Sequence, residues 1–330
     1  MKKWYYTIGV DVSKNTLDIH CPELNIHIQI SNNLEGFKQF LKWCKTNKID
    51  LSKSFLVMEY TGGYEYKLIA FCEASSIPYA RISGLEIKRS MGITRGKSDK
   101  VDAARIAQYG EEKHKTLQPT KPLNKNIIQL KETLGFRKRL VREIAGYKAT
   151  LKERKHMYPD LKQDIICKTL ESKIKETIKQ IASLDAELLK IVAANEALKT
   201  NYELLTSIKG IGMVNALMTI AYTENFVCFS NPRSYAVYVG VVPFEYSSGS
   251  SIRGRKKVSS IANKELKQEL NQAARSTIQW DKELQEYALK KMNSKCYNIV
   301  LNNLKFKLIL RMFAVVKRGE KYVDNYKKAA

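Results

Sequence analysis

The feature that most constrains the fold is a change of pattern at Pro119 and Pro122. Before these prolines, short apolar runs typical of strands alternate with segments of helical period. After them, residues 123–194 are rich in Lys, Glu, Leu and Ile, with one break around residues 157–159. Proline interrupts both helices and sheets, so the change marks a domain boundary. The sequence therefore predicts an α/β domain followed by a mainly helical region.

The α/β region is expected to contain a mixed sheet with helices on its faces. Three strands over residues 4–30 form an antiparallel meander in this interpretation. Strands and helices then alternate, with a helix at 32–48, a strand at 55–58, a helix at 64–75, a strand at 79–82 and a helix ending near 115. A meander followed by alternating elements favours a mixed sheet over a purely antiparallel one.

Four carboxylates in this region are candidates for one site. Asp11 ends the first predicted strand and Glu59 ends the fourth, and ligands of open α/β sheets gather beyond strand carboxyl ends. Asp99 and Asp102 share one face of a helix, where two like charges repel unless a cation such as Mg²⁺ or Mn²⁺ offsets them. The alternative is an ordinary helix start, capped by Ser98 and favoured by the helix dipole. We interpret three nearby acids as surface residues, namely Asp18, Glu65 and Glu73.

The charge balance points to a polyanionic partner. The 330 residues contain 57 Lys and Arg against 33 Asp and Glu, a net charge of +24. Nucleic acid is the leading interpretation, because each neutralised phosphate releases counterions. An acidic membrane surface is the alternative, although the sequence shows no long apolar span and no export signal.

The cysteines and histidines do not suggest a zinc site. The six cysteines are scattered without a CxxC pair, and the four histidines do not cluster near them. Scattered thiols suit a reducing cytoplasm, and we interpret these cysteines as small core residues.

The helical region is predicted to have two parts. Residues 123–194 read as two long helices packed as an antiparallel hairpin or coiled coil, a structural or dimerising arm. Residues 204–217 read as helix, glycine turn and helix, with Lys209, Gly210 and Gly212 as candidates for gripping a DNA backbone. A plain helical turn inside a core is the alternative. Further helices are expected at 264–278 and 299–318.

Residues 246–257 contain four serines, two glycines and four basic residues. This composition predicts an exposed, mobile, cationic loop. The loop either binds phosphate or carries a serine nucleophile, with Arg253, Arg255 or Lys256 stabilising the developing charge. No histidine lies nearby in sequence to activate a serine.

Five stretches then carry a resemblance to a known family. They are residues 9–14, 58–64, 97–103, 208–212 and 246–254. In this order they resemble the motifs of DEDD transposases of the insertion-sequence one-ten family, over nearly the whole chain. Two departures are Ser98, where the family often has threonine, and Ala262, where it usually has glycine.

The resemblance implies a three-part chain. It implies a ribonuclease-H-like domain of the RuvC type over residues 1–118, a coiled-coil arm over 119–200 and a serine-bearing transposase domain over 201–330. Motif by motif, it implies Mg²⁺ (or Mn²⁺) binding by Asp11, Glu59, Asp99 and Asp102. It implies that Ser248 joins covalently to DNA, a choice over Ser247, Ser250 and Ser251 that depends on motif alignment alone.

The resemblance also implies a biological activity. Members of the family excise and insert their element through a circular intermediate, guided by a structured bridge RNA that pairs with donor and target DNA. They work as dimers that pair into tetramers, and different subunits contribute the acidic and serine domains. A prokaryotic, nucleoid-associated, cytoplasmic protein is expected. The alternatives are a junction resolvase or nuclease that uses water, and a non-catalytic nucleic-acid-binding protein.

Overall fold

The computed structural model describes residues 4–92, 96, 98–122, 124–161, 164–229, 231–248 and 252–324. Contacts divide the chain into two compact units, Met1–Pro122 and Leu123–Ala330, so that the boundary falls at the second of the two prolines. The further division near residue 200 stays a prediction.

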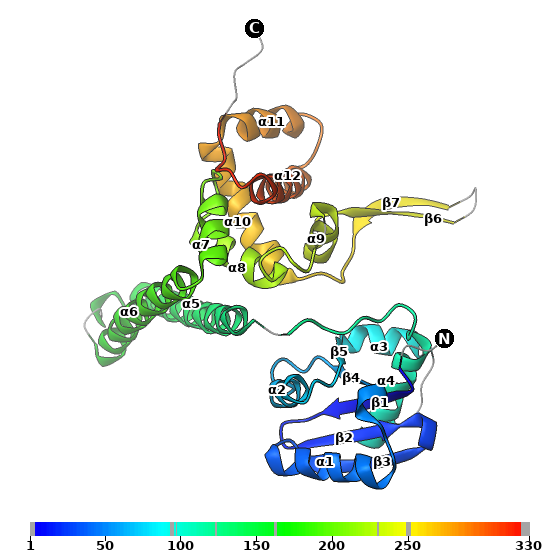
Figure 1. Cartoon of the computed structure of the whole chain (residues 1–330). Helices are drawn as coiled ribbons and strands as arrows, with labels where there is room; N and C mark the ends of the chain where they lie inside the picture. The colour runs from blue at the N-terminus through cyan, green and yellow to red at the C-terminus, as the bar shows by residue number, and fades with distance from the viewer. Residues whose placement is uncertain are drawn as a thin grey trace. The chain divides into compact units, whose positions relative to one another are not determined.

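The first unit is built on a five-stranded mixed sheet (Figure 1). Its strands are β1 (Tyr6–Val12), β2 (Thr16–Cys21), β3 (Ile26–Ser31), β4 (Ser54–Glu59) and β5 (Tyr79–Ile82). The spatial order is β3-β2-β1-β4-β5, in which β1, β2 and β3 pair antiparallel while β4 pairs parallel with β1 and β5. This is the mixed sheet of the ribonuclease-H-like, RuvC-type class, so the predicted fold class is confirmed.

In the described part of the first unit, four helices accompany the sheet. They are α1 (Leu34–Thr46), α2 (Tyr66–Ala74), α3 (Gly84–Ser90) and α4 (Asp99–Glu112). Three were expected from the sequence. The seven-residue α3 buries only Ile87 and is too short for its period to be recognised. Short 3₁₀ turns lie at Pro22–Leu24, Leu51–Lys53 and Pro159–Leu161.

Small residues let α4 lie unusually close to the sheet. A Cβ atom built on Gly9 would lie 2.3 Å from the carbonyl oxygen of Ala103 and 2.3 Å from the amide nitrogen of Ala107. One built on Gly110 would lie 2.7 Å from methyl groups of Thr7 and Val57. Any larger residue would separate helix from sheet at native packing density. This close packing fixes the first turn of α4 relative to β1.

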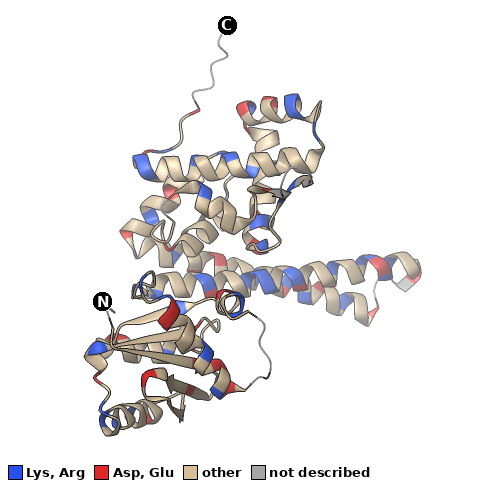
Figure 2. Ribbon diagram, turned by 90° about the vertical axis from the view of Figure 1, so that its right-hand side faces the viewer, with Lys and Arg blue, Asp and Glu red and all other residues tan. Residues whose placement is uncertain are grey.

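The second unit begins with two long helices, α5 (Lys125–Met157) and α6 (Ile165–Ala193). Ion pairs between them connect residues progressively nearer the turn, from Arg137 with Asp185 to Arg154 with Asp164. This pattern requires an antiparallel pair, so the predicted helical hairpin is confirmed. Figure 2 shows Lys and Arg distributed along both helices.

The remaining helices enclose one apolar core. They are α7 (Glu196–Thr206), α8 (Met213–Thr223), α9 (Pro232–Val239), α10 (Lys264–Trp280), α11 (Lys282–Met292) and α12 (Tyr297–Arg318). The core also takes in the start of α5, through Ile127, and the end of α6, through Ile191. A two-stranded hairpin of β6 (Pro243–Ser248) and β7 (Ile252–Val258) projects from the region of α9 (Figure 1). None of the helices that the structure describes is long and apolar enough to cross a membrane.

The cysteine interpretation holds in part. Cys21, Cys44, Cys72 and Cys167 are buried, as expected of small core residues. Cys228 and Cys296 are exposed, so the core interpretation was wrong for these two, because polarity alone does not place a cysteine.

The turn between α7 and α8 depends on Gly210, which has φ of +89°. A Cβ atom there would lie 2.4 Å from Thr277 Cγ2 and 3.0 Å from Ala273 O on α10. Both constraints are met only by glycine. Gly212 differs, because it caps α8 with φ of −88° and a Cβ atom would meet nothing within 4 Å.

Gly210→Ala should therefore destabilise the second unit by roughly 2–4 kcal/mol, from left-handed strain and overpacking together. Urea unfolding measures the change. Gly212→Ala is the matched control and should cost under about 1 kcal/mol. Equal losses in the two variants would contradict this packing argument.

Candidate active site

The sheet brings Asp11 and Glu59 to one edge. Strands β1 and β4 run parallel, and Val10 pairs with Met58 in their register. The next residue on each strand is the acid, so the two carboxylates lie at the carboxyl ends of neighbouring parallel strands, at the same edge of the sheet. This is the position at which open α/β sheets bind ligands.

Helix α4 brings the other two acids toward the same place. Ser98 caps it, because its hydroxyl oxygen accepts a hydrogen bond from the Val101 amide at 3.3 Å, so the capping interpretation is confirmed. Asp99 and Asp102 occupy the first turn. Arg105 donates from Nη1 to Asp102 Oδ1 at 2.9 Å and from Nη2 to the Gly96 carbonyl at 3.1 Å. This arginine, which the sequence did not single out, fixes the orientation of Asp102.

Electrostatics link the four acids. Burial raises the pKa of Asp11 to about 6, and the nearby carboxylates add to the rise in the order Asp102, Asp99, Glu59 and Asp18. Among the described residues, none donates a hydrogen bond to the Asp11 side chain. Asp11 is therefore a partly buried carboxylate in an acidic environment, which is where a cation would be favourable.

The ligand set is not assembled as the side chains stand. Within the described part of the chain, no three His, Cys, Asp or Glu side chains lie close enough to hold one metal ion. The oxygen donors fit a hard divalent cation, so binding one requires the carboxylates to move closer together.

Glu59 lies against α3 through a glycine that the sequence did not identify. A Cβ atom built on Gly84, the first residue of α3, would lie 1.9 Å from Glu59 Oε1. Both residues line a pocket of about 360 Å³, together with Asp102 and Arg105. Because glycine has no side chain, position 84 leaves room for the Glu59 carboxylate in the pocket that Asp102 also lines.

Gly84→Ala is expected to displace the Glu59 carboxylate while leaving the fold intact, because the methyl group meets only the end of a flexible side chain. A misplacement of about 1 Å costs on the order of 10²-fold in rate. The measurement is DNA strand cleavage, with urea unfolding as the control for folding. Cleavage at the wild-type rate would show that Glu59 does not need this position.

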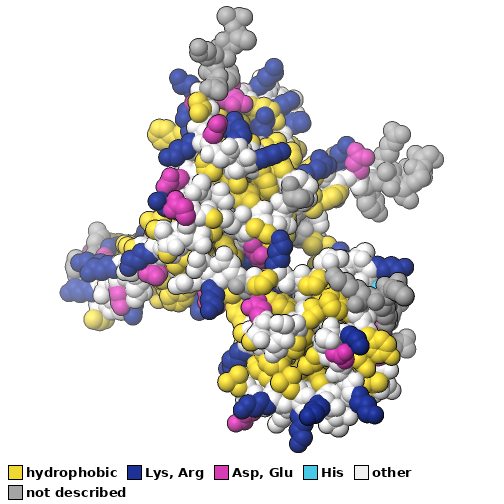
Figure 3. Space-filling view, viewed as in Figure 1, with side chains coloured by type: hydrophobic (Ala, Val, Ile, Leu, Met, Phe, Trp, Pro, Cys, Tyr) yellow, Lys and Arg dark blue, Asp and Glu magenta, His cyan; other side chains and the backbone are white. Residues whose placement is uncertain are grey.

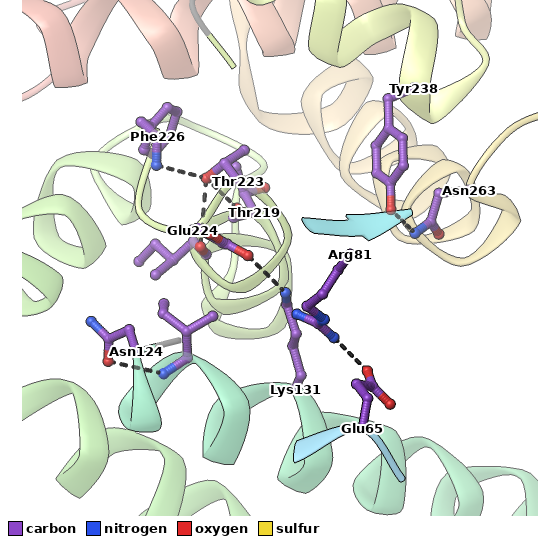
Figure 4. A network of polar contacts seen from close by, with 12 residues as sticks. Glu65, Arg81, Asn124, Lys131, Thr219, Thr223, Glu224, Phe226, Tyr238 and Asn263 are labelled. Atoms are coloured by element: carbon purple, nitrogen blue, oxygen red, sulfur yellow. Dashed lines mark hydrogen bonds and ion pairs between the residues drawn. The ribbon is translucent and has the colours of Figure 1, made fainter. Parts of the chain in front are cut away.

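A buried ion pair supports the loop that follows Glu59. The Arg81 guanidinium donates to Glu65 Oε1 at 2.6 Å, and Glu65 is fully buried (Figure 4). Glu65 also accepts bonds from the Thr61 hydroxyl at 2.5 Å and the Gly63 amide at 2.9 Å. Burial by itself raises the pKa of Glu65, but these bonds outweigh it and lower that pKa overall. The glycine-containing turn is thereby held by a charge-assisted network.

The surface interpretation of two acids was therefore wrong. Glu65 is buried as described, and Asp18 is 5% exposed and accepts hydrogen bonds from His27 and Gln29 on β3. Each was misplaced because its partner is distant in sequence. Glu73 is exposed, as predicted.

The described parts of the serine-rich segment are strands. Residues 243–248 and 252–258 form the strands β6 and β7, with Ser247 opposite Arg253 and Ser248 opposite Ile252. The prediction of a loop was wrong for residues 246–248 and 252–257, because composition alone did not reveal the cross-strand pairing, while the predicted exposure holds at Gly254, Lys256 and Lys257. Residues 249–251 and the side chains of Ser248, Arg253 and Arg255 lie outside what the structure describes. Lys256 forms an ion pair with Glu245.

The loop after the hairpin accommodates the departure at Ala262. A Cβ atom on Gly240, which has φ of +77°, would lie 2.4 Å from the Ala262 methyl group. The extra methyl of Ala262 therefore occupies space that Gly240 leaves open. Asn263 then caps α10 and donates from Nδ2 to the Tyr238 hydroxyl at 3.1 Å (Figure 4).

Lys209, predicted to contact nucleic acid, forms an ion pair with Asp324 that raises its pKa. The pair is half exposed, so it costs little to exchange for a phosphate. Figure 3 shows Lys and Arg side chains spread over the visible face of both units.

The first unit thus carries acids at one edge of its sheet, and the helical unit carries a basic hairpin. The sequence was compared with models of known protein families, and two of them match it. A model for DEDD-type IS110 transposases matches residues 8–154, and a model described as the transposase IS116/IS110/IS902 family matches residues 202–289. These features define a DNA transposase or recombinase.

The chain belongs to this IS110-type transposase family. It is 27% identical to the pilin gene-inverting proteins of Moraxella lacunata and Moraxella bovis over 279 residues, covering 82% of this chain and 81% of each relative.

Proposed function

We propose that this recombinase cuts DNA with Ser248 as nucleophile, assisted by a divalent cation held by Asp11, Glu59, Asp99 and Asp102, and that a structured RNA guides it. The observation that carries the proposal is the acidic environment of Asp11. Burial raises its pKa to about 6, and carboxylates from the end of β4 and the start of α4, up to 91 residues away in sequence, add to the rise. Carboxylates that repel one another and have perturbed pKa values are typical of functional sites.

The four acids would hold Mg²⁺ or Mn²⁺. The ion would supply positive charge to a bound phosphodiester, which is the usual contribution of such sites. The protein's own part is to place the carboxylates. Close packing of α4 on Gly9 sets the distance of Asp99 and Asp102 from the sheet. Arg105 orients Asp102, and Gly84 leaves room for Glu59.

The serine step exchanges one ester for another. The Ser248 Oγ forms a bond to phosphorus, and the bond from phosphorus to one deoxyribose oxygen breaks. The serine proton goes to a base, and the departing oxygen takes up a proton to become a hydroxyl group. The new phosphoserine ester conserves the bond energy, so the strand can be rejoined without another energy source.

The partners follow from charge and from relatives. The net charge of +24 suits DNA and RNA together. The names of the two relatives describe inversion of a gene, which requires cutting and rejoining DNA.

We further propose donor and target DNA as substrates and the division into domains 1–118, 119–200 and 201–330. Dimers that pair into tetramers would let one subunit supply the acids and another the serine. In the DNA-binding role we include Lys209, Gly210, Gly212, Arg253, Arg255 and Lys256.

The test is to map a covalent adduct on the wild-type protein. The protein is incubated with labelled DNA from the element's end, co-purified RNA and Mg²⁺, then denatured and digested. Mass spectrometry should find a nucleotide on a peptide spanning Ser248, and EDTA should prevent its formation. Cleavage without any adduct would overturn the nucleophile proposal and favour a nuclease that uses water. Sequencing of the co-purified RNA tests guidance, which fails if no single structured RNA is enriched.

A further inference from the structure

A basic groove lies at the base of the hairpin, and Lys256 is the one residue that it shares with the function proposed above. It has a volume of about 760 Å³ and is lined by residues from β6, β7, α10 and α12 and from the turn before α12. Five of its lining residues are lysines, namely Lys256, Lys257, Lys267, Lys295 and Lys305. No carboxylate is found among the described residues that line it.

Lys305 is the feature that points to a ligand. It projects from the middle of α12, and only 5% of its surface is exposed. Its side chain has no hydrogen bond or ion pair with any residue that the structure describes. Burial, with a smaller effect of the neighbouring Lys267, lowers its pKa to about 8. An ammonium group on a largely buried side chain next to a second cation is costly, and an anion in the groove would relieve both costs.

The groove is also lined by polar groups with fixed orientations. Lys267 donates to the Gly240 carbonyl at 2.7 Å, and Asn302 donates to the Val241 carbonyl at 2.6 Å. These bonds tie the wall of the groove to the end of α9. Three further asparagines line it, Asn271, Asn298 and Asn303, whose amides are suited to phosphate and sugar oxygens. The chemistry matches a phosphodiester better than a small carboxylate.

The length of the hairpin indicates how far the bound phosphodiester lies from Ser248. Pro243 of β6 and Val258 of β7 both line the groove, and Ser248 ends β6 five residues from Pro243. At about 3.3 Å per residue, the two points are separated by roughly 16 Å. This spacing corresponds to about five nucleotides of duplex along one strand.

We propose that the Lys305 groove binds a backbone phosphate of the DNA strand that the hairpin engages, about five nucleotides from the site of attack. The DNA assignment rests on the proposed role of Ser248, because the strand attacked there passes the base of the same hairpin. The groove holds the strand in register, and it reads no sequence through this contact.

The experiment measures binding without cleavage. A fluorescein-labelled duplex of the element's end is titrated in EDTA at several salt concentrations, and anisotropy is followed. Lys305→Met should weaken binding roughly tenfold and reduce the slope of log K against log salt by about 0.9. Lys305→Arg should retain most of the affinity. Lys282→Met, an exposed lysine of α11 outside the groove, is the matched control and should change affinity less than twofold.

Each outcome decides the proposal. Unchanged DNA affinity and salt slope in Lys305→Met overturn it. A loss seen only with a structured RNA of equal length would also overturn it, and would assign the groove to RNA. If Lys305→Met fails to fold, Lys295→Met at the exposed rim tests the groove without touching the core. The titration needs no nucleophile, so failure of the Ser248 proposal leaves this result interpretable.

Discussion

Ser248→Ala should abolish the covalent protein–DNA adduct, with recombination falling on the order of 10³-fold or more. The hydroxyl oxygen is the attacking atom in the proposed step, and alanine has no substitute for it. Alanine is compatible with the backbone of strand β6, so DNA binding and thermal stability should not change. The measurements are the adduct on a denaturing gel, and recombination between two plasmids that carry the element's ends.

Ser247→Ala is the matched control. It removes the same hydroxyl group one residue earlier in strand β6. We expect Ser247→Ala to retain adduct formation. If the two variants behave in the reverse way, the nucleophile is Ser247. If both variants still form the adduct, the nucleophile is Ser250 or Ser251. If both cleave DNA without an adduct, the enzyme uses water, and the junction resolvase alternative gains.

Asp11→Asn should abolish DNA cleavage, again by on the order of 10³-fold, and yet make the metal-free protein more stable. Asp11 has a folded-state pKa of about 6 against an ordinary value of 3.8. The Asp11 carboxyl therefore holds its proton more tightly in the folded than in the unfolded protein. The free energy of unfolding consequently falls as pH rises from about 4 to about 6. At neutral pH this opposes folding by roughly 1–3 kcal/mol, which the amide removes.

Urea unfolding in EDTA between pH 4.5 and pH 7.5 measures this effect. The wild-type protein should lose stability across the window, and Asp11→Asn should lose less. Glu35→Gln, at an exposed acid in the first turn of α1, should leave the pH profile unchanged. Addition of Mg²⁺ at pH 7.5 should raise the melting temperature of the wild type and not that of Asp11→Asn. Equal pH profiles in wild type and Asp11→Asn would show that Asp11 is not electrostatically strained.

Sequence patterns located most elements of the fold. Apolar runs and alternation placed β1 to β5, helical periodicity placed the two arm helices, and the glycines marked the turn before α8. The cap at Ser98 was also readable, since it depends on neighbours three residues apart. Helices α3, α9 and α11 were not predicted, and α3 has only seven residues. The hairpin was mistaken for a loop because its pairing depends on partners across the turn rather than on composition.

The sequence by itself determined the family and the candidate chemical groups, namely four acids and a serine beside basic residues. Those groups are defined by residue type and order, which a sequence displays directly. Only the tertiary structure decided how they are supported. Gly9 and Gly84 set the positions of α4 and Glu59, Arg81 compensates the buried Glu65, and Lys305 lies buried in a groove. The physical reason is that distance and burial depend on contacts between segments far apart in the chain, and charge alone does not specify them.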